Sequence, residues 1–172
     1  MRPWELCRGL GRSFGYNAQE TAADTLTGTK LVHLLADVVA HSGNLLINVG
    51  PDGTGHIPDL QQRPLRELGA WLDANGEAIY ATRPWTPTAT TTSAGDQVRF
   101  THGKDTVYAI VLSGRLTDHL TIRGLTLPAS SRVGVLGGIA DLAWTQAADN
   151  VRITPPPQPS SQHAQVLTIT TP

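Results

Sequence analysis

The sequence predicts an α/β fold followed by an all-β fold. Residues 1–82 are interpreted as a remnant of an α/β barrel, the last strand–helix units of a TIM-like barrel, and residues 83–172 as an antiparallel β-sandwich. Residues 45–49 are apolar on both alternating faces apart from Asn48, which is typical of a parallel strand covered by helices on both sides. After residue 82, short alternating segments separated by Gly, Asp or Pro replace the helical periodicity.

The first expected helix precedes that strand. Its apolar residues recur at helical spacing: Leu31, Leu34, Leu35, Val38 and Val39. Thr27 or Thr29 can cap its start, and Gly43 follows its end. Residues 44–49 then form the strand, and residues 50–55 form a loop of tight turns. No similar run occurs in the first half of the chain, so we expect this strand to lack neighbours here and its surroundings to be encoded elsewhere.

A second helix is expected to start near Pro58, a residue that suits the first helical position. Its apolar stripe comprises Leu65, Leu68, Trp71 and Leu72. Gly76 after Asn75 is interpreted as its C-terminal cap. Pro64 removes a backbone donor and is expected to kink the helix or delay its regular part, at about 3 kcal/mol if unrelieved. The order helix, strand, loop, helix is typical of an α/β barrel or a doubly wound sheet.

The second half is expected to contain strands only, with no helix after Tyr80. Residues 83–93 are interpreted as an extended connector. Strands are expected at residues 97–101, 106–112, 120–127, 132–136, 151–153 and 166–170. Residues 155–159 are expected to form a polyproline-like spacer. Trp71, Trp85 and Trp144 are interpreted as packing residues.

Composition and motifs exclude several classes of protein. The net charge is −1 with scattered basic residues, and no apolar run approaches a membrane span, so neither a nucleic-acid nor a membrane partner is expected. The six histidines never take the spacing of a helical metal pair, so neither a metal nor another cofactor is expected. The N-terminus lacks the apolar segment of a signal peptide. The compartment is left open among secreted, periplasmic and lysosome-like, and so is the oligomeric state.

Residues 3–17 combine a carboxylate with aromatic residues and glycines, which suits sugar recognition. A carboxyl group that is shielded by an indole can have its pKa raised enough to donate a proton near neutral pH. On this interpretation Trp4 shields Glu5. The alternative, favoured by the local sequence alone, is that Glu5 is a solvated carboxylate and Trp4 a core residue.

Several segments resemble the C-terminal part of the α-L-fucosidases, a family of retaining glycoside hydrolases, in the family's order and approximate spacing. They are Pro3-Trp4-Glu5-Leu6-Cys7, Ser13-Phe14-Gly15-Tyr16-Asn17, residues 43–53 (GNLLINVGPDG) and residues 75–80 (NGEAIY), with further agreement at residues 69–72 and 83–85. The resemblance implies a catalytic α/β barrel followed by a β-sandwich, removal of terminal fucose from glycans, and no metal cofactor. Phe14 replaces a more usual Trp and preserves an aromatic wall.

The resemblance implies that Glu5 is the acid/base residue, with Trp4, Phe14, Tyr16 and Asn48 lining or supporting the sugar pocket. For Asn48, bonding to loop backbone is an equally weighted alternative. The family's nucleophile, an aspartate on an earlier barrel strand, has no counterpart in this sequence. Four aspartates are candidates by residue type only: Asp24, Asp37, Asp52 and Asp59. Asp37 and Asp59 are interpreted as solvated charges and Asp52 as a turn residue.

The leading hypothesis is therefore a C-terminal fragment of a retaining α-L-fucosidase, with a fucosylated glycan or fucoside as its substrate. Because a retaining glycosidase needs two carboxyl groups about 5–5.5 Å apart, the isolated chain is predicted to be inactive. The alternative is a non-catalytic module, in which the sandwich binds glycan or stabilises a partner and the barrel piece is vestigial. A third possibility is a truncated product without independent activity.

Overall fold

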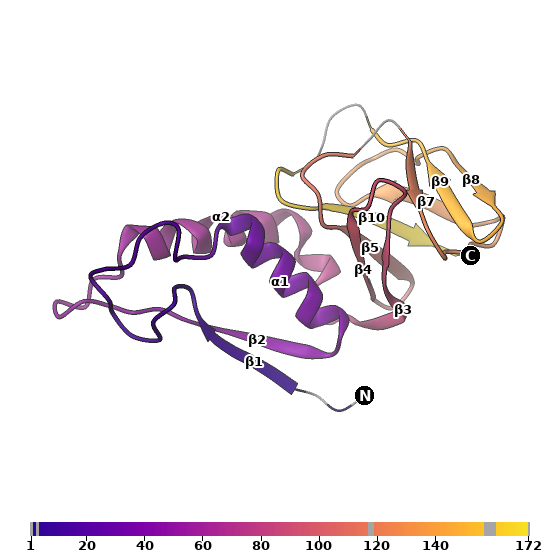
Figure 1. Cartoon of the computed structure of the whole chain (residues 1–172). Coiled ribbons are helices and arrows are strands. Elements are labelled where there is room, and N and C mark those ends of the chain that lie inside the picture. Colours follow the sequence, from indigo (N-terminus) through magenta and orange to yellow (C-terminus); the bar gives the residue numbers. More distant parts are fainter. Residues whose placement is uncertain (1, 3, 117–118, 157–160, 172) are drawn as a thin grey trace.

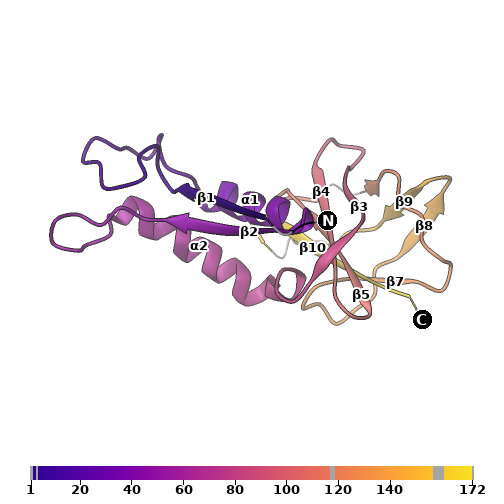
Figure 2. The ribbon, with the colours of Figure 1, turned by 90° about the horizontal axis from the view of Figure 1, so that it is seen from below.

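The computed structural model describes residues 2, 4–116, 119–156 and 161–171. These residues form layers: a pair of strands, β1 and β2, lies against helices α1 and α2, and two β-sheets follow (Figure 1). Viewed from below, the strand pair overlies the helices, and the sheets lie beyond the end of the helices where β1 begins (Figure 2). The predicted order of an α/β part followed by an all-β part is confirmed.

Strand β1 (Trp4–Gly9) pairs in parallel with β2 (Gly43–Asn48), with Trp4 opposite Gly43 and Gly9 opposite Asn48. The expectation that the apolar strand has no neighbour in this chain is therefore wrong. Strand β1 escaped sequence analysis because Glu5 and Arg8 interrupt its apolar pattern. Leu46 of β2 is 49% exposed, so one face of this strand is uncovered here.

Helix α1 (Gly28–Ala40) connects the two strands. The hydroxyl of Thr27 accepts a hydrogen bond from the amide of Lys30 at 3.2 Å, so Thr27 is the N-cap, as predicted. Its apolar residues pack toward α2 and the following sheet, because Val32 and Ala36 are fully buried there. The helix ends at His41, just before Gly43.

Helix α2 (Asp59–Asn75) is continuous through Pro64, and Pro58 occupies the N-cap rather than the first helical position. Gly76 ends the helix but keeps a right-handed conformation with φ −59°, and it begins the short 3-10 helix η1 (Gly76–Ala78). The prediction that Gly76 is the C-terminal cap is confirmed, because its amide donates to the carbonyl of Leu72, although its backbone is not left-handed. A Cβ at Gly76 would lie 2.9 Å from the ring of Tyr80.

The all-β part consists of two antiparallel sheets. The first has five strands in the order β3-β4-β5-β10-β7: β3 (Arg83–Thr91), β4 (Gln97–His102), β5 (Thr106–Val111), β10 (Gln165–Thr170) and β7 (Arg132–Val135). The second has the order β6-β9-β8: β6 (Leu120–Ile122), β9 (Asn150–Ile153) and β8 (Trp144–Ala147). The predicted sandwich is confirmed, because one apolar cluster is contributed by both sheets.

Three details of the second half differ from expectation. The expected connector is largely strand β3, an edge strand that tolerates its prolines and shifts register between Pro84 and Ala89. Strand β8 was not predicted, because three of its four residues are exposed and its sequence, WTQA, does not alternate between apolar and polar residues. Strand β6 ends at Ile122, two residues before Gly124, whose φ of +60° turns the chain. Residues 157–159 of the expected polyproline segment lie outside the described residues.

The five-stranded sheet is buried on both faces. On β5, Ala109 and Val111 face the three-stranded sheet, whereas Tyr108 and Ile110 face the helices. The helices and the turn after them contribute five residues to the second cluster: Val32, Ala36, Trp71, Ala78 and Ile79. The helices and the sandwich therefore share one apolar interface, which fixes the strand pair relative to the sheets.

Candidate functional site

The two faces of the β1–β2 pair differ in what covers them. A Cβ at Gly43 would lie 2.7 Å from the Trp4 ring and from the Val38 side chain of α1, so this face of the pair packs on the helix. Because side chains alternate along a strand, Glu5 and Cys7 of β1 lie on the opposite face, together with the residues paired with them, Asn44 and Leu46. All four are exposed, and we call them the open face.

Trp4 and Glu5 therefore point to opposite faces. The indole Nε1 of Trp4 donates a hydrogen bond to the carbonyl of His41 at 2.8 Å, on the helix side. The expectation that the indole shields Glu5 does not hold, since neighbouring residues of a strand cannot share a face. Trp4 packs on Gly43 at the start of β1 and is 41% exposed.

The position of Glu5 along the strand bears on its predicted role. Glu5 is the second residue of β1 and Gly9 the last. At about 3.3 Å per residue, Glu5 lies roughly 13 Å from the C-terminal end of the strand. Catalytic groups of α/β barrels come from the C-terminal ends of the strands. The proton-donor role that the resemblance implies for Glu5 stays a prediction.

The C-terminal ends of β1 and β2 carry two loops that lie against each other. A Cβ at Gly50 would lie 2.6 Å from the backbone of Gly15 and Tyr16, and the side chain of Asn48 donates a hydrogen bond to the carbonyl of Phe14. Asn48 thus takes the backbone-bonding role, one of its two predicted alternatives. Phe14 and Tyr16 are 60% and 51% exposed, so their rings are available at this end.

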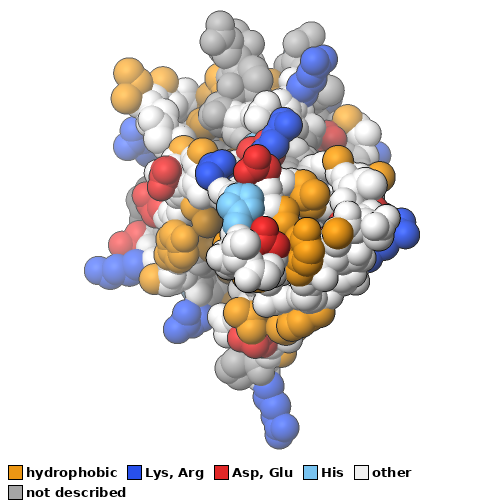
Figure 3. Space-filling model, turned by 90° about the vertical axis from the view of Figure 1, so that its left-hand side faces the viewer, with side chains coloured by type: hydrophobic (Ala, Val, Ile, Leu, Met, Phe, Trp, Pro, Cys, Tyr) orange, Lys and Arg blue, Asp and Glu red, His pale blue; other side chains and the backbone are white. Residues whose placement is uncertain are grey.

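Figure 3 looks onto this end of the molecule. A histidine lies near the centre of the view, with acidic side chains close to it and hydrophobic side chains on either side. The mixture of aromatic or apolar surface with polar groups is the kind of surface that binds sugars, whose rings have apolar faces and polar rims.

The carboxylates at this end are held by local contacts. Asp52 accepts hydrogen bonds from the Thr54 hydroxyl at 2.6 Å and from the amides of Thr54 and His56, and these bonds lower the pKa of Asp52. The predicted turn role is confirmed. Hydrogen bonds from the amide and hydroxyl of Thr21 lower the pKa of Asp24.

Glu20 supports the loop that follows β1. Its Oε1 accepts a hydrogen bond from the amide of Ser13 at 2.7 Å, and its carboxylate lies where a Cβ at Gly11 would be. Asp59 is exposed at the first turn of α2, as predicted. The carboxylates near the loops therefore stabilise turns and helix starts.

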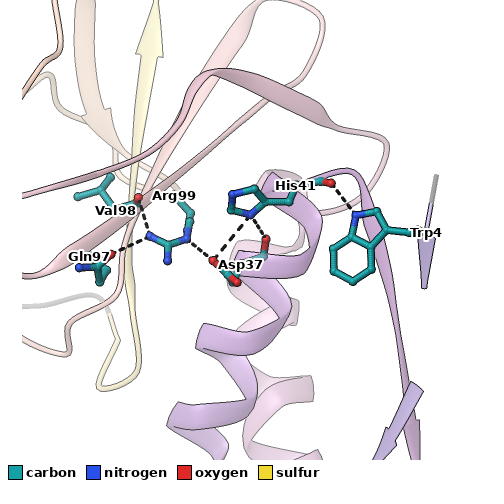
Figure 4. A network of polar contacts seen from close by, with 6 residues as sticks. All are labelled: Trp4, Asp37, His41, Gln97, Val98 and Arg99. Carbon is teal, nitrogen blue, oxygen red and sulfur yellow. Dashed lines mark hydrogen bonds and ion pairs between the residues drawn. The ribbon is translucent and has the colours of Figure 1, made fainter. Parts of the chain in front are cut away.

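Asp37 is not the solvated charge that the sequence predicted. Its carboxylate forms an ion pair with Arg99 of β4 and lies 3.8 Å from Nδ1 of His41 (Figure 4). Sequence analysis missed this because the two partners are 62 positions apart. Among the described residues, no group of three or more His, Cys, Asp or Glu side chains could hold a metal ion. No described helix is long and apolar enough to span a membrane.

The second half offers little aromatic surface for a glycan. Phe100 and Tyr108 are buried, and Trp85 packs on Phe100 with ring centroids 5.3 Å apart. Trp144 is half-buried and donates to the carbonyl of Ser131 at 3.1 Å. The predicted packing roles of the tryptophans are confirmed, and Trp71 is likewise 3% exposed.

Comparisons with known proteins agree with this architecture. The family model described as alpha-L-fucosidase matches residues 1–77. The α-L-fucosidase of Branchiostoma floridae is 39% identical over 142 residues, which is 82% of this chain and 31% of that protein. The tissue α-L-fucosidase of Mus musculus is 32% identical over 144 residues, which is 83% of this chain and 31% of that protein.

Among solved structures, Thermotoga maritima α-fucosidase in complex with a mechanism-based inhibitor is similar over 98% of this chain and 40% of its own, with a TM-score of 0.93 and 38% identity. The chain spans about a third of the length of the curated relatives, at 31% of each. By these matches the chain is similar to the α-L-fucosidases, and residues 1–77 fall within the model of that family.

Proposed function

We propose that this chain is part of a retaining α-L-fucosidase and supplies one wall of the fucose site, formed by Phe14 and Tyr16. The observation that carries this proposal is the pairing of the loops after β1 and β2 at the C-terminal end of two parallel strands, with both rings exposed there. Active sites of α/β barrels are built from such loops. An aromatic ring can pack against the apolar face of a sugar, and Asn48 holds the loop that presents Phe14.

The proposal includes the barrel itself. In an α/β barrel the helices lie outside and the strands enclose a packed interior. Helix α1 packs on one face of the β1–β2 pair, and the residues of the open face are exposed. This arrangement fits two adjacent barrel strands whose open face turns toward the interior.

The reacting carboxyl groups are proposed to come from outside these 172 residues. Double displacement requires a nucleophile and an acid/base residue about 5–5.5 Å apart. Asp24 and Asp52 accept hydrogen bonds from their own loops, and Glu5 lies near the opposite end of β1. The isolated chain is therefore expected to release no aglycone from an aryl α-L-fucoside.

A chimeric enzyme tests the proposal. In it, this chain replaces the matching stretch of Thermotoga maritima α-fucosidase, which is 38% identical. We expect the chimera to hydrolyse an aryl α-L-fucoside and Phe14→Ala to raise KM about tenfold, the equivalent of about 1.4 kcal/mol of lost binding. Tyr80→Ala is the matched control, because Tyr80 is also an exposed aromatic residue but lies beside the start of β2.

Glu5→Gln separates the two assignments of chemistry. A residue that protonates the leaving group contributes about 10²–10⁴-fold, most strongly for poor leaving groups. We expect Glu5→Gln to lower kcat by less than about tenfold, which is well below the contribution of a proton donor. A larger loss confined to poor leaving groups returns Glu5 to the proton-donor role. A folded chimera without activity contradicts the proposed function as a whole.

The stabilising form of the alternative is favoured by a separate observation. The five-stranded sheet and the helices share the cluster of Tyr108, Ile110 and Trp71. We propose that the sandwich supports the barrel part rather than binding glycan. On a glycan array probed with this chain, we expect no glycan whose binding depends on residues 83–172.

A further inference from the structure

A continuous line of polar contacts runs from the sandwich to the first strand (Figure 4). Arg99 of β4 forms an ion pair with Asp37 near the end of α1. Nδ1 of His41 lies 2.7 Å from the carbonyl of Asp37, and because a carbonyl can only accept, this nitrogen carries the proton. The carbonyl of His41 accepts the indole N–H of Trp4 at 2.8 Å.

The sandwich end of this line is held in one position. The Arg99 side chain is only 14% exposed, and its NH1 group donates to the carbonyl of Val98 at 3.1 Å and to Oε1 of Gln97 at 3.2 Å. All three residues lie on β4, whose two neighbours in the sheet are β3 and β5. A guanidinium fixed on both sides presents its Nε to Asp37 in a single geometry.

Electrostatics explains why the contact with Asp37 matters. Asp37 lies in the last turn of α1, where unpaired carbonyls carry partial negative charge and a carboxylate is unfavourable. The residues of that turn, all of them described, include no basic residue. The compensating positive charge comes from Arg99 on β4. Without Arg99, the carboxylate of Asp37 would repel the carbonyl groups of the turn that presents the His41 carbonyl.

The other end of the line controls where β1 starts. The Trp4 ring packs where Gly43 lacks a side chain, and its N–H donates to the carbonyl of His41, so the indole contacts both the end of α1 and the first residue of β2. At its far end, β1 leads into the loop that carries Phe14, which Asn48 of β2 holds. The pair is therefore fixed at its start by Trp4 and at its end by Asn48.

We propose that Arg99 is a positioning residue: through Asp37 and His41 it fixes the Trp4 indole, and so sets strand β1 and the loop that presents Phe14. The consequence for fucose binding rests on the proposed function of that loop. The coupling between Arg99 and Trp4 does not depend on that proposed function.

The first test uses this chain alone. In ¹⁵N spectra of the tryptophan-labelled protein, the indole signal of Trp4 is assigned with Trp4→Phe. We expect Arg99→Gln and Asp37→Asn to shift that signal and to speed exchange of its proton at least about tenfold. Arg99→Lys keeps the charge without the fork and is expected to restore part of the protection.

Arg132→Gln is the matched control, since Arg132 and Asp141 form an ion pair of 2.9 Å within the sandwich. It is expected to leave the Trp4 signal unchanged. If Arg99→Gln does not fold, Asp37→Asn decides, because Asp37 is half-exposed. A folded variant of either residue with an unchanged Trp4 signal, or an equal effect of Arg132→Gln, overturns the coupling.

The second test measures KM and kcat in the chimeric enzyme. Arg99→Gln is expected to raise KM several-fold with a smaller change in kcat, and Arg99→Lys to reverse part of that rise. An effect on kcat alone overturns the link to the Phe14 loop. If Phe14→Ala leaves KM unchanged while Arg99→Gln still disturbs Trp4, the proposed function fails and the coupling stands.

Discussion

Replacement of Trp71 tests whether the helices and the sheets unfold together. Trp71 of α2 is 3% exposed, and its indole donates to the carbonyl of Ala164, just before β10, at 3.2 Å. It lies in the cluster that also contains Ile110 and Val166 of the five-stranded sheet. Trp71→Ala is expected to lower the free energy of unfolding by about 3–5 kcal/mol through lost contacts and the cavity that remains.

Trp71→Phe separates packing from hydrogen bonding. Phenylalanine keeps most of the buried ring but leaves the Ala164 carbonyl without its donor, which is expected to cost about 1–3 kcal/mol. Both variants are measured by urea unfolding, followed by circular dichroism, and by amide hydrogen exchange of α2, β5 and β10. Because the cluster is shared, we expect protection to fall by the same free energy in the helix and in the two strands.

Trp144→Phe is the control, since Trp144 makes the same type of hydrogen bond, to Ser131, within the sandwich. It is expected to leave the difference between helix and strand protection unchanged. Loss of protection in α2 with β5 and β10 unaffected would refute the reasoning. The boundary near residue 82 would then also be a boundary between independently unfolding units.

Gly43→Ala is expected to destabilise the chain by about 1–3 kcal/mol in urea unfolding, because the new methyl group meets the indole and a valine at 2.7 Å; Gly69→Ala, in open space on α2, is expected to stabilise it by about 0.5–1 kcal/mol. Burial, with a hydrogen bond to the carboxylate of Glu77, raises the pKa of Tyr108 to about 12, so an absorbance titration should show Tyr108 ionising well above the usual tyrosine value of about 10. The pKa of Tyr108 is higher in the folded chain than in the unfolded chain. The contribution of neutral Tyr108 to the free energy of unfolding is therefore fully present below about pH 10 and is lost as the pH rises through about 12. We expect the exposed Leu46 to cause concentration-dependent self-association in sedimentation equilibrium under reducing conditions, and Leu46→Thr to weaken it. Ile139→Thr, at an even more exposed apolar residue of the sandwich, should leave the self-association unchanged, and the reverse outcome would place the self-associating surface elsewhere.

The elements that the sequence predicted are those with a local signal. Helix α1 has both its apolar period and its cap within 14 residues, from Thr27 to Ala40. The strands of the five-stranded sheet alternate or are wholly apolar because both faces are buried, as on β5. Period and turn chemistry are properties of neighbouring residues, so they can be recognised without the partner segment.

The elements that were missed depend on distant partners. Strand β1 has charged residues at positions 5 and 8, and it is a strand because β2 pairs with it in register. Strand β3 contains prolines that argue against a central strand, and only its place at the edge of the sheet accommodates them. The charge of Asp37 was assigned to solvent because nothing near it in sequence indicates Arg99.

The candidate site divides in the same way. The turn role of Asp52 follows from the residues next to it, whereas the choice between two roles for Asn48 required the position of Phe14. The motif around Trp4 and Glu5 identified the family but not the geometry, since strand alternation separates the two side chains. The family resemblance named these residues, and only the pairing of β1 with β2 shows which face of the strand each of them occupies.

In this structure each layer holds the next one in place. The sheets bury the helices, the helices hold the strand pair, and the pair presents Phe14 and Tyr16 at one end while the open face remains exposed. A barrel interior is packed with side chains, so an exposed carboxylate such as Glu5 needs a donor there if strands from elsewhere close over it. The exposed Leu46 needs apolar neighbours for the same reason. Any segment that covers the open face must therefore bring apolar side chains around Leu46 and a hydrogen-bond donor or cation opposite Glu5.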